Sequence, residues 1–109
     1  MISLDQTKIR QALFNLLRNA QESIQHTHGR ILFSASVVPD GVQITISDNG
    51  CGMTEDQIEN AFRPFVTYKP GGTGLGLAVT RQIIEAHQGT LCVESTPKEG
   101  TSFYIFLPG

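Results

Sequence analysis

Hydrophobic residues recur along this chain with two different periods. Between residues 5 and 25 they return every three or four positions, which places them on one face of a helix. Between residues 42 and 48 apolar and polar residues alternate, which is typical of a strand with one buried face. Both patterns appear again later in the sequence, so helices and strands both contribute to the fold.

Capping and turn residues divide the chain into successive elements. Asp5 is placed to cap a first helix, which the segment 26–29 ends. Thr54 and Gln57 form a capping box for a second helix, and Gly89 stops a third. The predicted elements are helices at 5–25, 55–61 and 74–88, strands at 2–4, 30–38, 42–48, 90–95 and 101–107, and an irregular segment at 62–72. Helices inserted between antiparallel hairpins predict a two-layer α+β sandwich.

A glycine-rich run, 71–76, precedes the third helix. Glycine lets a ligand approach the backbone, and the first N–H groups of a helix are unpaired and lie at the positive end of its dipole. The run therefore predicts a phosphate site, with a plain flexible turn as the alternative. It is not a P-loop, because the chain has no Gly-Lys pair, and Leu77 or Val79 replaces the last glycine of a dinucleotide fingerprint.

Asp48 ends the alternating strand and opens a second glycine-rich turn, 49–53. A carboxylate in this place can accept a hydrogen bond from the exocyclic amine of a nucleotide base. The glycines let the base lie against the backbone. Since Asn-Gly is also a common turn sequence, a loop without a ligand is the alternative.

Asn15 and Asn19 are four residues apart and lie on one face of the first helix. Asparagine is a mediocre helix former, so two such residues within a helix carry a local cost. An amide oxygen is a suitable ligand for Mg²⁺, which prefers hard oxygen donors. Two solvated polar residues are the alternative.

Together these segments resemble the catalytic and ATP-binding domain of histidine kinases, in the superfamily that includes DNA gyrase B, Hsp90 and MutL. Five motifs occur in the family's order: an N box at 15–20, a G1 box at 48–52, an F box at 62–65, a G2 box at 72–77 and a closing Gly-Thr-x-Phe at 100–103. The likeness covers about Asp5 to Leu107, and Tyr68–Gly72 is most similar to nitrogen-regulation-type sensor kinases. The resemblance implies one domain over 1–109 with the Bergerat ATP-binding fold, a mixed and mostly antiparallel sheet packed on three helices.

The resemblance also implies an adenine site. Asp48 would accept a hydrogen bond from the adenine amino group, and Thr101 would assist through a bound water. The other expected contacts to the ring are Gly50, Gly52, Met53 and Ile58.

At the phosphate end the resemblance implies that Asn19 ligates Mg²⁺ and that Asn15 supports the metal or the phosphates. Lys69 and Arg18 are candidate cationic contacts, with solvated surface charges as the alternative. Glu22 stands where many members carry Lys or Arg, so that contact is missing or supplied elsewhere. The G2 box would line the phosphates with Gly72, Thr73, Gly74, Leu75, Gly76 and Leu77.

Asn15 also bears on the chemistry, which we assign to Asn15, Asn19 and Lys69. Members of the superfamily that hydrolyse ATP carry a glutamate as general base at the position of Asn15. An amide does not accept a proton at neutral pH, so phosphoryl transfer to another domain is favoured over hydrolysis.

The chain itself shows no acceptor for the phosphoryl group. Its histidines are His26, His28 and His87, and none has the sequence context of the phosphoacceptor in the family. The resemblance therefore implies a partner, the His-containing dimerisation domain of the same kinase, and a response regulator downstream. A non-catalytic ATP-dependent docking module and a serine kinase of the anti-sigma-factor type are the alternatives, and a hydrolysing clamp ATPase is disfavoured.

Composition agrees with one cytoplasmic domain. The net charge of −2, without a run of Lys or Arg, gives no reason to expect nucleic acid. No apolar stretch is long enough to span a membrane, and the first residues do not form a signal peptide. The two cysteines lack zinc-site spacing and indicate a reduced compartment, with Cys92 expected in the core and Cys51 in a loop.

Overall fold

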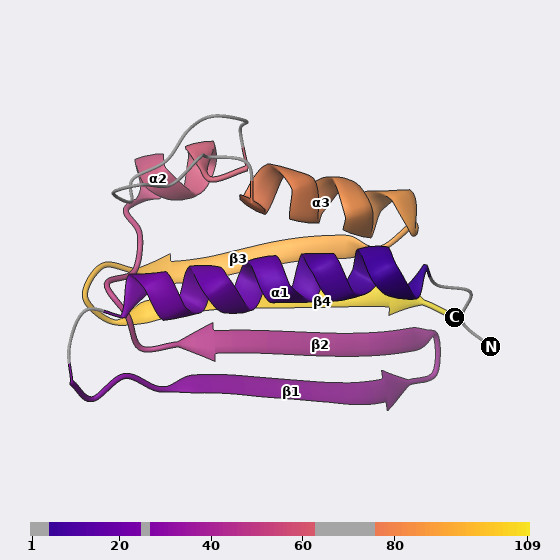
Figure 1. Cartoon of the computed structure of the whole chain (residues 1–109), viewed down its shortest axis with the longest axis horizontal. Coiled ribbons are helices and arrows are strands. Elements are labelled where there is room, and N and C mark those ends of the chain that lie inside the picture. Colours follow the sequence, from indigo (N-terminus) through magenta and orange to yellow (C-terminus); the bar gives the residue numbers. More distant parts are fainter. Residues whose placement is uncertain (1–4, 25–26, 63–75) are drawn as a thin grey trace.

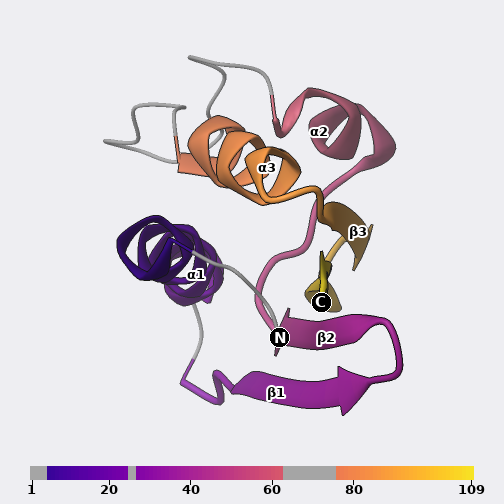
Figure 2. The ribbon, with the colours of Figure 1, turned by 90° about the vertical axis from the view of Figure 1, so that its right-hand side faces the viewer.

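The computed structural model describes residues 5–24, 27–62 and 76–109, which form one sheet and a layer of helices (Figures 1 and 2). The sheet contains β1 (Ile31–Val38), β2 (Gly41–Asp48), β3 (Thr90–Thr96) and β4 (Gly100–Pro108), and the helices are α1 (Gln6–Ser23), α2 (Glu55–Asn60) and α3 (Gly76–Ala86). This arrangement confirms the predicted two-layer α+β architecture. The predicted strand at 2–4 and irregular segment at 62–72, all but its first residue, fall outside the described residues.

All strand pairs of the described sheet are antiparallel, in the order β1-β2-β4-β3. The two-residue turn 39–40 joins β1 to β2. β4 lies between β2 and β3. The central pair of the sheet, β2 and β4, therefore joins strands from distant parts of the chain. This pairing places the end of β2 beside the start of β4.

The first helix begins as predicted, because Asp5 accepts a hydrogen bond from the Lys8 N–H at 3.2 Å. It ends at Ser23, two residues before the predicted end. Ile24 is extended, and the Ser23 carbonyl accepts a hydrogen bond from the Cys51 N–H at 2.9 Å instead of from the next helical turn. A residue from another part of the chain therefore holds the end of α1.

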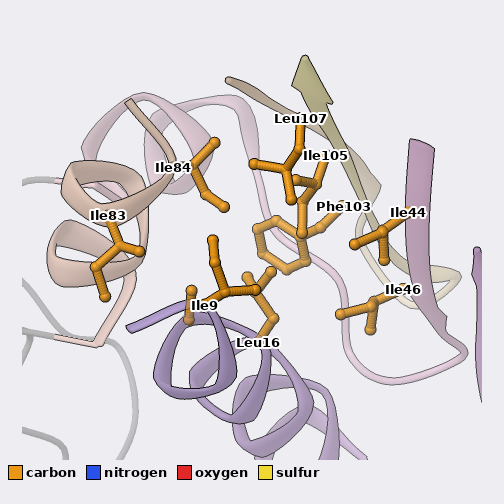
Figure 3. Close-up of a cluster of buried hydrophobic side chains, with 10 residues drawn as sticks. Ile9, Leu16, Ile44, Ile46, Ile83, Ile84, Phe103, Ile105 and Leu107 are labelled. Carbon is orange, nitrogen blue, oxygen red and sulfur yellow. The ribbon is translucent and has the colours of Figure 1, made fainter. Parts of the chain in front are cut away.

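The hydrophobic core lies between the sheet and helices α1 and α3 (Figure 3). Every second residue of β2 and β4 points into it, and the helices contribute residues spaced by three or four. Its buried members are Ile9, Ala12, Leu16, Ile44, Ile46, Ile83, Ile84, Phe103, Ile105 and Leu107. Phe103 is fully buried and meets the Phe62 ring edge to face, with centroids 6.5 Å apart. This contact ties the chain just after α2 to the core.

Two predicted helix boundaries behave differently. Thr54 and Gln57 form the predicted capping box at the start of α2. The third helix ends at Ala86 rather than at 88, and the left-handed residue is Gln88, with φ 62°, not Gly89. Gly89 donates to the Ile84 carbonyl at 2.9 Å and Gln88 to the Glu85 carbonyl at 2.9 Å, the pattern of a Schellman motif.

The outer strands carry more exposed apolar surface than the sequence indicates. Cys92, expected in the core, is exposed because Leu91 and Val93 occupy the inward positions of β3. In β1, Phe33 and Val37 point to the helical side of the sheet but remain 49% and 87% exposed. Figure 2 shows β1 beyond the edge of the helical layer. No helix within the described ranges has the length and apolar content required to cross a bilayer.

Candidate functional site

A polar pair closes the apolar layer where β2 ends and β4 begins. Asp48 and Thr101 are register partners, and they lie on the same face as buried Ile46 and Phe103. Thr101 is 4% exposed, and Asp48 is half-buried. The alternation of each strand therefore delivers a carboxylate and a hydroxyl to one point on the helix-covered face.

The two oxygens of Asp48 have different surroundings. Oδ1 accepts hydrogen bonds from the Gly50 N–H at 2.8 Å and from the Ser23 hydroxyl at 3.1 Å. Oδ2 is buried and has no hydrogen-bond partner within the described residues. An unsatisfied buried acceptor costs about 1–3 kcal/mol, and more when it is charged. Oδ2 is thus positioned to accept a hydrogen bond from a ligand.

Thr101 belongs to a small network of hydroxyl groups. Its Oγ1 lies 2.8 Å from the Ser95 Oγ, which accepts from the Met53 N–H at 2.8 Å and donates to the Gly100 carbonyl at 2.9 Å. A serine hydroxyl has one proton. When Ser95 gives it to Gly100, Thr101 donates to Ser95 and keeps its own lone pairs available as acceptors.

The glycines of the turn after β2 are required by packing within the chain. A Cβ on Gly50 would collide with the side chain and carbonyl of Ser23. Gly52 has φ 68°, and a Cβ there would collide with the Thr96 carbonyl. The turn is therefore clamped between the end of α1 and the turn that joins β3 to β4. That these glycines let a base approach stays a prediction.

Asn49 fixes the same turn from another side, a role that the sequence did not reveal. Its side-chain oxygen accepts from the Arg30 N–H at 2.6 Å, and its Nδ2 donates to the His28 carbonyl at 2.9 Å. These bonds connect the segment after α1 to the turn that follows Asp48. The Asn49 side chain thus holds the turn in place, whereas the neighbouring Asp48 keeps one carboxylate oxygen that a ligand could reach.

The two asparagines of α1 lie half-buried on one face of the helix, as their spacing predicts. Arg18, beside them in sequence, is exposed. Ser23 continues the series Asn15, Asn19 by a further four residues and contacts Asp48 directly. This spacing was the signal in the sequence that could have identified Ser23.

The remaining predicted site residues divide into two groups. Met53 and Ile58 are half-buried, Met53 directly after the clamped turn and Ile58 in α2. Gly76 is the first residue of α3 and Leu77, the second, is half-buried. The other predicted contacts lie outside the described residues: Lys69, Gly72, Thr73, Gly74 and Leu75.

The histidines of the described part have structural surroundings. His87 follows α3, where its Nε2 accepts from the Asp5 N–H at 3.1 Å and its Nδ1 lies 2.8 Å from the Ile83 carbonyl. This ring joins the start of α1 to the end of α3. His28 is exposed, and its carbonyl accepts from Asn49. Across residues 5–24, 27–62 and 76–109, no three His, Cys, Asp or Glu side chains group as a metal site.

Residues 4–109 match the family described as histidine kinase-, DNA gyrase B-, and HSP90-like ATPase. The chain belongs to this ATPase family. Within it, the similar proteins are sensor kinases, and the chain corresponds to their catalytic ATPase domain.

Two curated relatives illustrate the likeness. Sporulation kinase B of Bacillus subtilis is 43% identical over 104 residues, which make up 95% of this chain and 24% of the relative. The sensor histidine kinase ZraS of Escherichia coli O157:H7 is 43% identical over 107 residues, 98% of this chain and 23% of the relative. The ATPase domain thus spans about a quarter of the length of these relatives. Neither name supports the predicted nitrogen-regulation subtype.

Solved structures show the same fold. The catalytic domain of histidine kinase ThkA superimposes with a TM-score of 0.84 at 34% identity, covering 98% of this chain and 70% of that one. Full-length ShkA, solved in complex with AMPPNP, superimposes with a TM-score of 0.81 at 29% identity, covering 96% of this chain and 23% of that one. The α+β sandwich of this ATPase domain is therefore the histidine kinase catalytic fold.

Proposed function

We propose that this chain is the ATP-binding catalytic domain of a two-component sensor histidine kinase. It binds Mg-ATP and supports transfer of the γ-phosphoryl group to a histidine on a separate dimerisation domain. The observation that carries the proposal is the buried, unsatisfied Asp48 Oδ2 at the end of β2. Membership of the ATPase family supports ATP as the nucleotide that binds.

At the adenine end, Asp48 Oδ2 accepts a hydrogen bond from the 6-amino group. Guanine presents a carbonyl at that position, which a carboxylate repels, so the site selects adenine. Thr101 assists through a water molecule, because the Ser95 network leaves its oxygen as an acceptor. Gly50 and Gly52 bring the backbone close to the ring, and Met53 and Ile58 provide its apolar walls.

At the phosphate end, Asn15 and Asn19 of α1 face the phosphates, and Asn19 holds Mg²⁺. A bound Mg²⁺ neutralises negative charge on the phosphate oxygens. Arg18 is exposed and free to reach a phosphate, and Lys69 and the residues 72–77 complete this end of the site. The sequence of the segment 68–72 is the basis for placing the domain near the nitrogen-regulation-type sensor kinases.

The type of reaction follows from Asn15, which stands where hydrolysing members of the superfamily carry a glutamate as general base. An amide does not activate water, so ATP persists until a nucleophile arrives from another domain. Phosphoryl transfer asks the protein mainly for positioning and charge stabilisation. A histidine on a dimerisation domain of the same kinase is the acceptor, and a response regulator receives the phosphoryl group afterwards. Such a kinase acts in the cytoplasm, where ATP is available.

Calorimetric titration of the chain with ATP, ADP and GTP, with and without Mg²⁺, tests the nucleotide site. We expect ATP to bind more tightly than GTP, and Asp48→Asn to weaken ATP about 10- to 100-fold, since hydrogen bonds to charged groups contribute about 1.5–3 kcal/mol. Asp40→Asn is the matched control, because Asp40 lies in the turn at the opposite end of β2. Equal affinity for ATP and GTP in the unaltered chain would overturn the assignment of Asp48.

Phosphate transfer needs its own measurement. The chain is mixed with labelled ATP and a separately produced His-bearing hairpin of a sensor kinase, and the label on the hairpin is followed. A catalytic domain labels the hairpin, and the label disappears when the acceptor histidine is replaced by glutamine. ATP binding without any labelling would favour the docking-module alternative, and label on an added protein's serine would favour the serine-kinase alternative.

A further inference from the structure

Ser23 connects α1 to the turn that carries Asp48 through both its backbone and its side chain. It is the last residue of α1 and is 6% exposed. Its carbonyl accepts from the Cys51 N–H at 2.9 Å, and its Oγ lies 3.1 Å from Asp48 Oδ1. The same Oγ lies 2.9 Å from the Ala20 carbonyl.

The single proton of the hydroxyl has two possible acceptors, Asp48 Oδ1 and the Ala20 carbonyl. A hydrogen bond to an ionised carboxylate is stronger than one to a neutral carbonyl. Charge therefore favours donation to Asp48, although the Ala20 carbonyl is the nearer acceptor, at 2.9 Å against 3.1 Å. The carbonyl of Ala20, within the last turn of the helix, competes more weakly for the same proton.

Two donors on one oxygen determine where the other oxygen points. The Gly50 N–H and the Ser23 hydroxyl both donate to Asp48 Oδ1, which holds the carboxylate against rotation about its last bond. Oδ2 then remains the oxygen without a partner within the described residues. Without Ser23, only the Gly50 N–H would distinguish the two oxygens.

We propose that Ser23 is a positioning residue for adenine recognition, holding the Asp48 carboxylate so that Oδ2 meets the 6-amino group. The inference rests on the proposed function, in which Asp48 binds adenine. Ser23 does not touch the nucleotide and acts through Asp48. Because Asn15, Asn19 and Ser23 share one face of α1, this helix sets both the phosphate end and the adenine end of the site.

The alternative is that Ser23 only terminates α1 by bonding back to Ala20. In that case Ser23→Ala lowers stability, as many lost hydrogen bonds do, and affects all nucleotides equally. A positioning role instead predicts an effect that depends on the 6-amino group. Purine riboside triphosphate, which is ATP without that group, separates the two roles.

The test measures the affinity of ATP and of purine riboside triphosphate for the unaltered chain and for Ser23→Ala by calorimetry. We expect the unaltered chain to prefer ATP, and Ser23→Ala to weaken ATP about three- to tenfold while the analogue changes less than about twofold. Ser47→Ala is the matched control. It removes a hydroxyl that pairs with Ser102 at 2.8 Å on the opposite face of β2, next to Asp48 in sequence.

Each result decides between the roles. Loss of the ATP preference in Ser23→Ala, with the preference intact in Ser47→Ala, supports the inference. An unchanged preference in Ser23→Ala overturns it and leaves the adenine site standing. If the unaltered chain does not distinguish the two nucleotides, Asp48 does not read the amino group, and its proposed role at the adenine end fails together with the inference.

Discussion

Asp48 and Thr101 face each other across the β2–β4 ladder, one at the end of its strand and the other near the start of its own. Both side chains lie on the helix-covered face of the sheet. The neighbouring inward residues, Ile46 of β2 and Phe103 of β4, belong to the core. A rigid apolar layer therefore supports both polar groups from behind. This is the arrangement that lets a short loop and two strands present fixed hydrogen-bonding groups.

Thr101→Val tests the hydroxyl of this pair. The valine keeps the shape of the buried side chain but removes the acceptor, so we expect ATP affinity to fall about three- to tenfold. Ser95 retains its bonds to Met53 and Gly100, so the free energy of unfolding should fall by no more than about 1.5 kcal/mol. Titration calorimetry and urea unfolding give the two values. Thr101→Ser keeps the hydroxyl and should bind ATP nearly as the unaltered chain does; unchanged affinity in Thr101→Val would remove Thr101 from the site.

Asn19→Ala tests the proposed metal ligand. We expect ATP affinity in Mg²⁺ to fall to the value measured in EDTA, because the amide oxygen proposed to hold the metal is gone. The measurement is the ratio of ATP affinities with and without the metal.

Gln21→Ala is the matched control for that ratio, since Gln21 also carries an amide on α1 but is exposed. It should keep the ratio of the unaltered chain. A ratio in Asn19→Ala equal to that of the control would show that Mg²⁺ is held elsewhere.

Much of the fold follows from local patterns in the sequence. The strands β1 and β2, the caps Asp5 and Thr54, and the architecture were predicted correctly because periodicity and capping are properties of neighbouring residues. The face of β3 was not predictable in this way. Leu91, Cys92 and Val93 are all apolar, and only the pairing of this strand with β4 decides which of them point inward.

Asp48 was singled out from the sequence by a local signal, because it ends an alternating strand before glycines. Its role in a nucleotide site stays a prediction. The roles of Ser23 and Ser95 depend on contacts with residues far away in the sequence, to Asp48 and to Met53 respectively. The end of α1 was misplaced for the same reason, since a backbone N–H from the turn after β2 takes its last carbonyl.

Ile46→Ala tests the position of the core. Ile46 in β2 is 1% exposed, whereas Val37, on the same side of neighbouring β1, is 87% exposed. We expect Ile46→Ala to lower the free energy of unfolding by about 2–5 kcal/mol. Val37→Thr keeps the branched side chain and should change it by less than about 0.5 kcal/mol. Urea unfolding measures both, and a comparable loss in the two variants would mean that the helical layer also covers β1.

Gln88→Gly tests the strained end of α3. Gln88 has φ 62°, a conformation that costs most L-residues about 1–2 kcal/mol and glycine almost nothing. Glycine loses more conformational entropy on folding, which offsets part of this gain. We therefore expect the free energy of unfolding to rise by about 0.5–1 kcal/mol. Urea unfolding at constant pH provides the value.

The same substitution at Gln82 should have the opposite sign, because Gln82 is exposed in the regular part of α3, where glycine costs about 0.8–1 kcal/mol relative to a good helix former. Both residues are exposed, and neither is among the residues proposed for the nucleotide site, so ATP affinity should not change in either variant. A loss of stability in both would mean that the Gln88 side chain contributes more than the relief of its backbone strain. The pair therefore separates backbone strain at the Schellman motif from ordinary helix propensity within one helix.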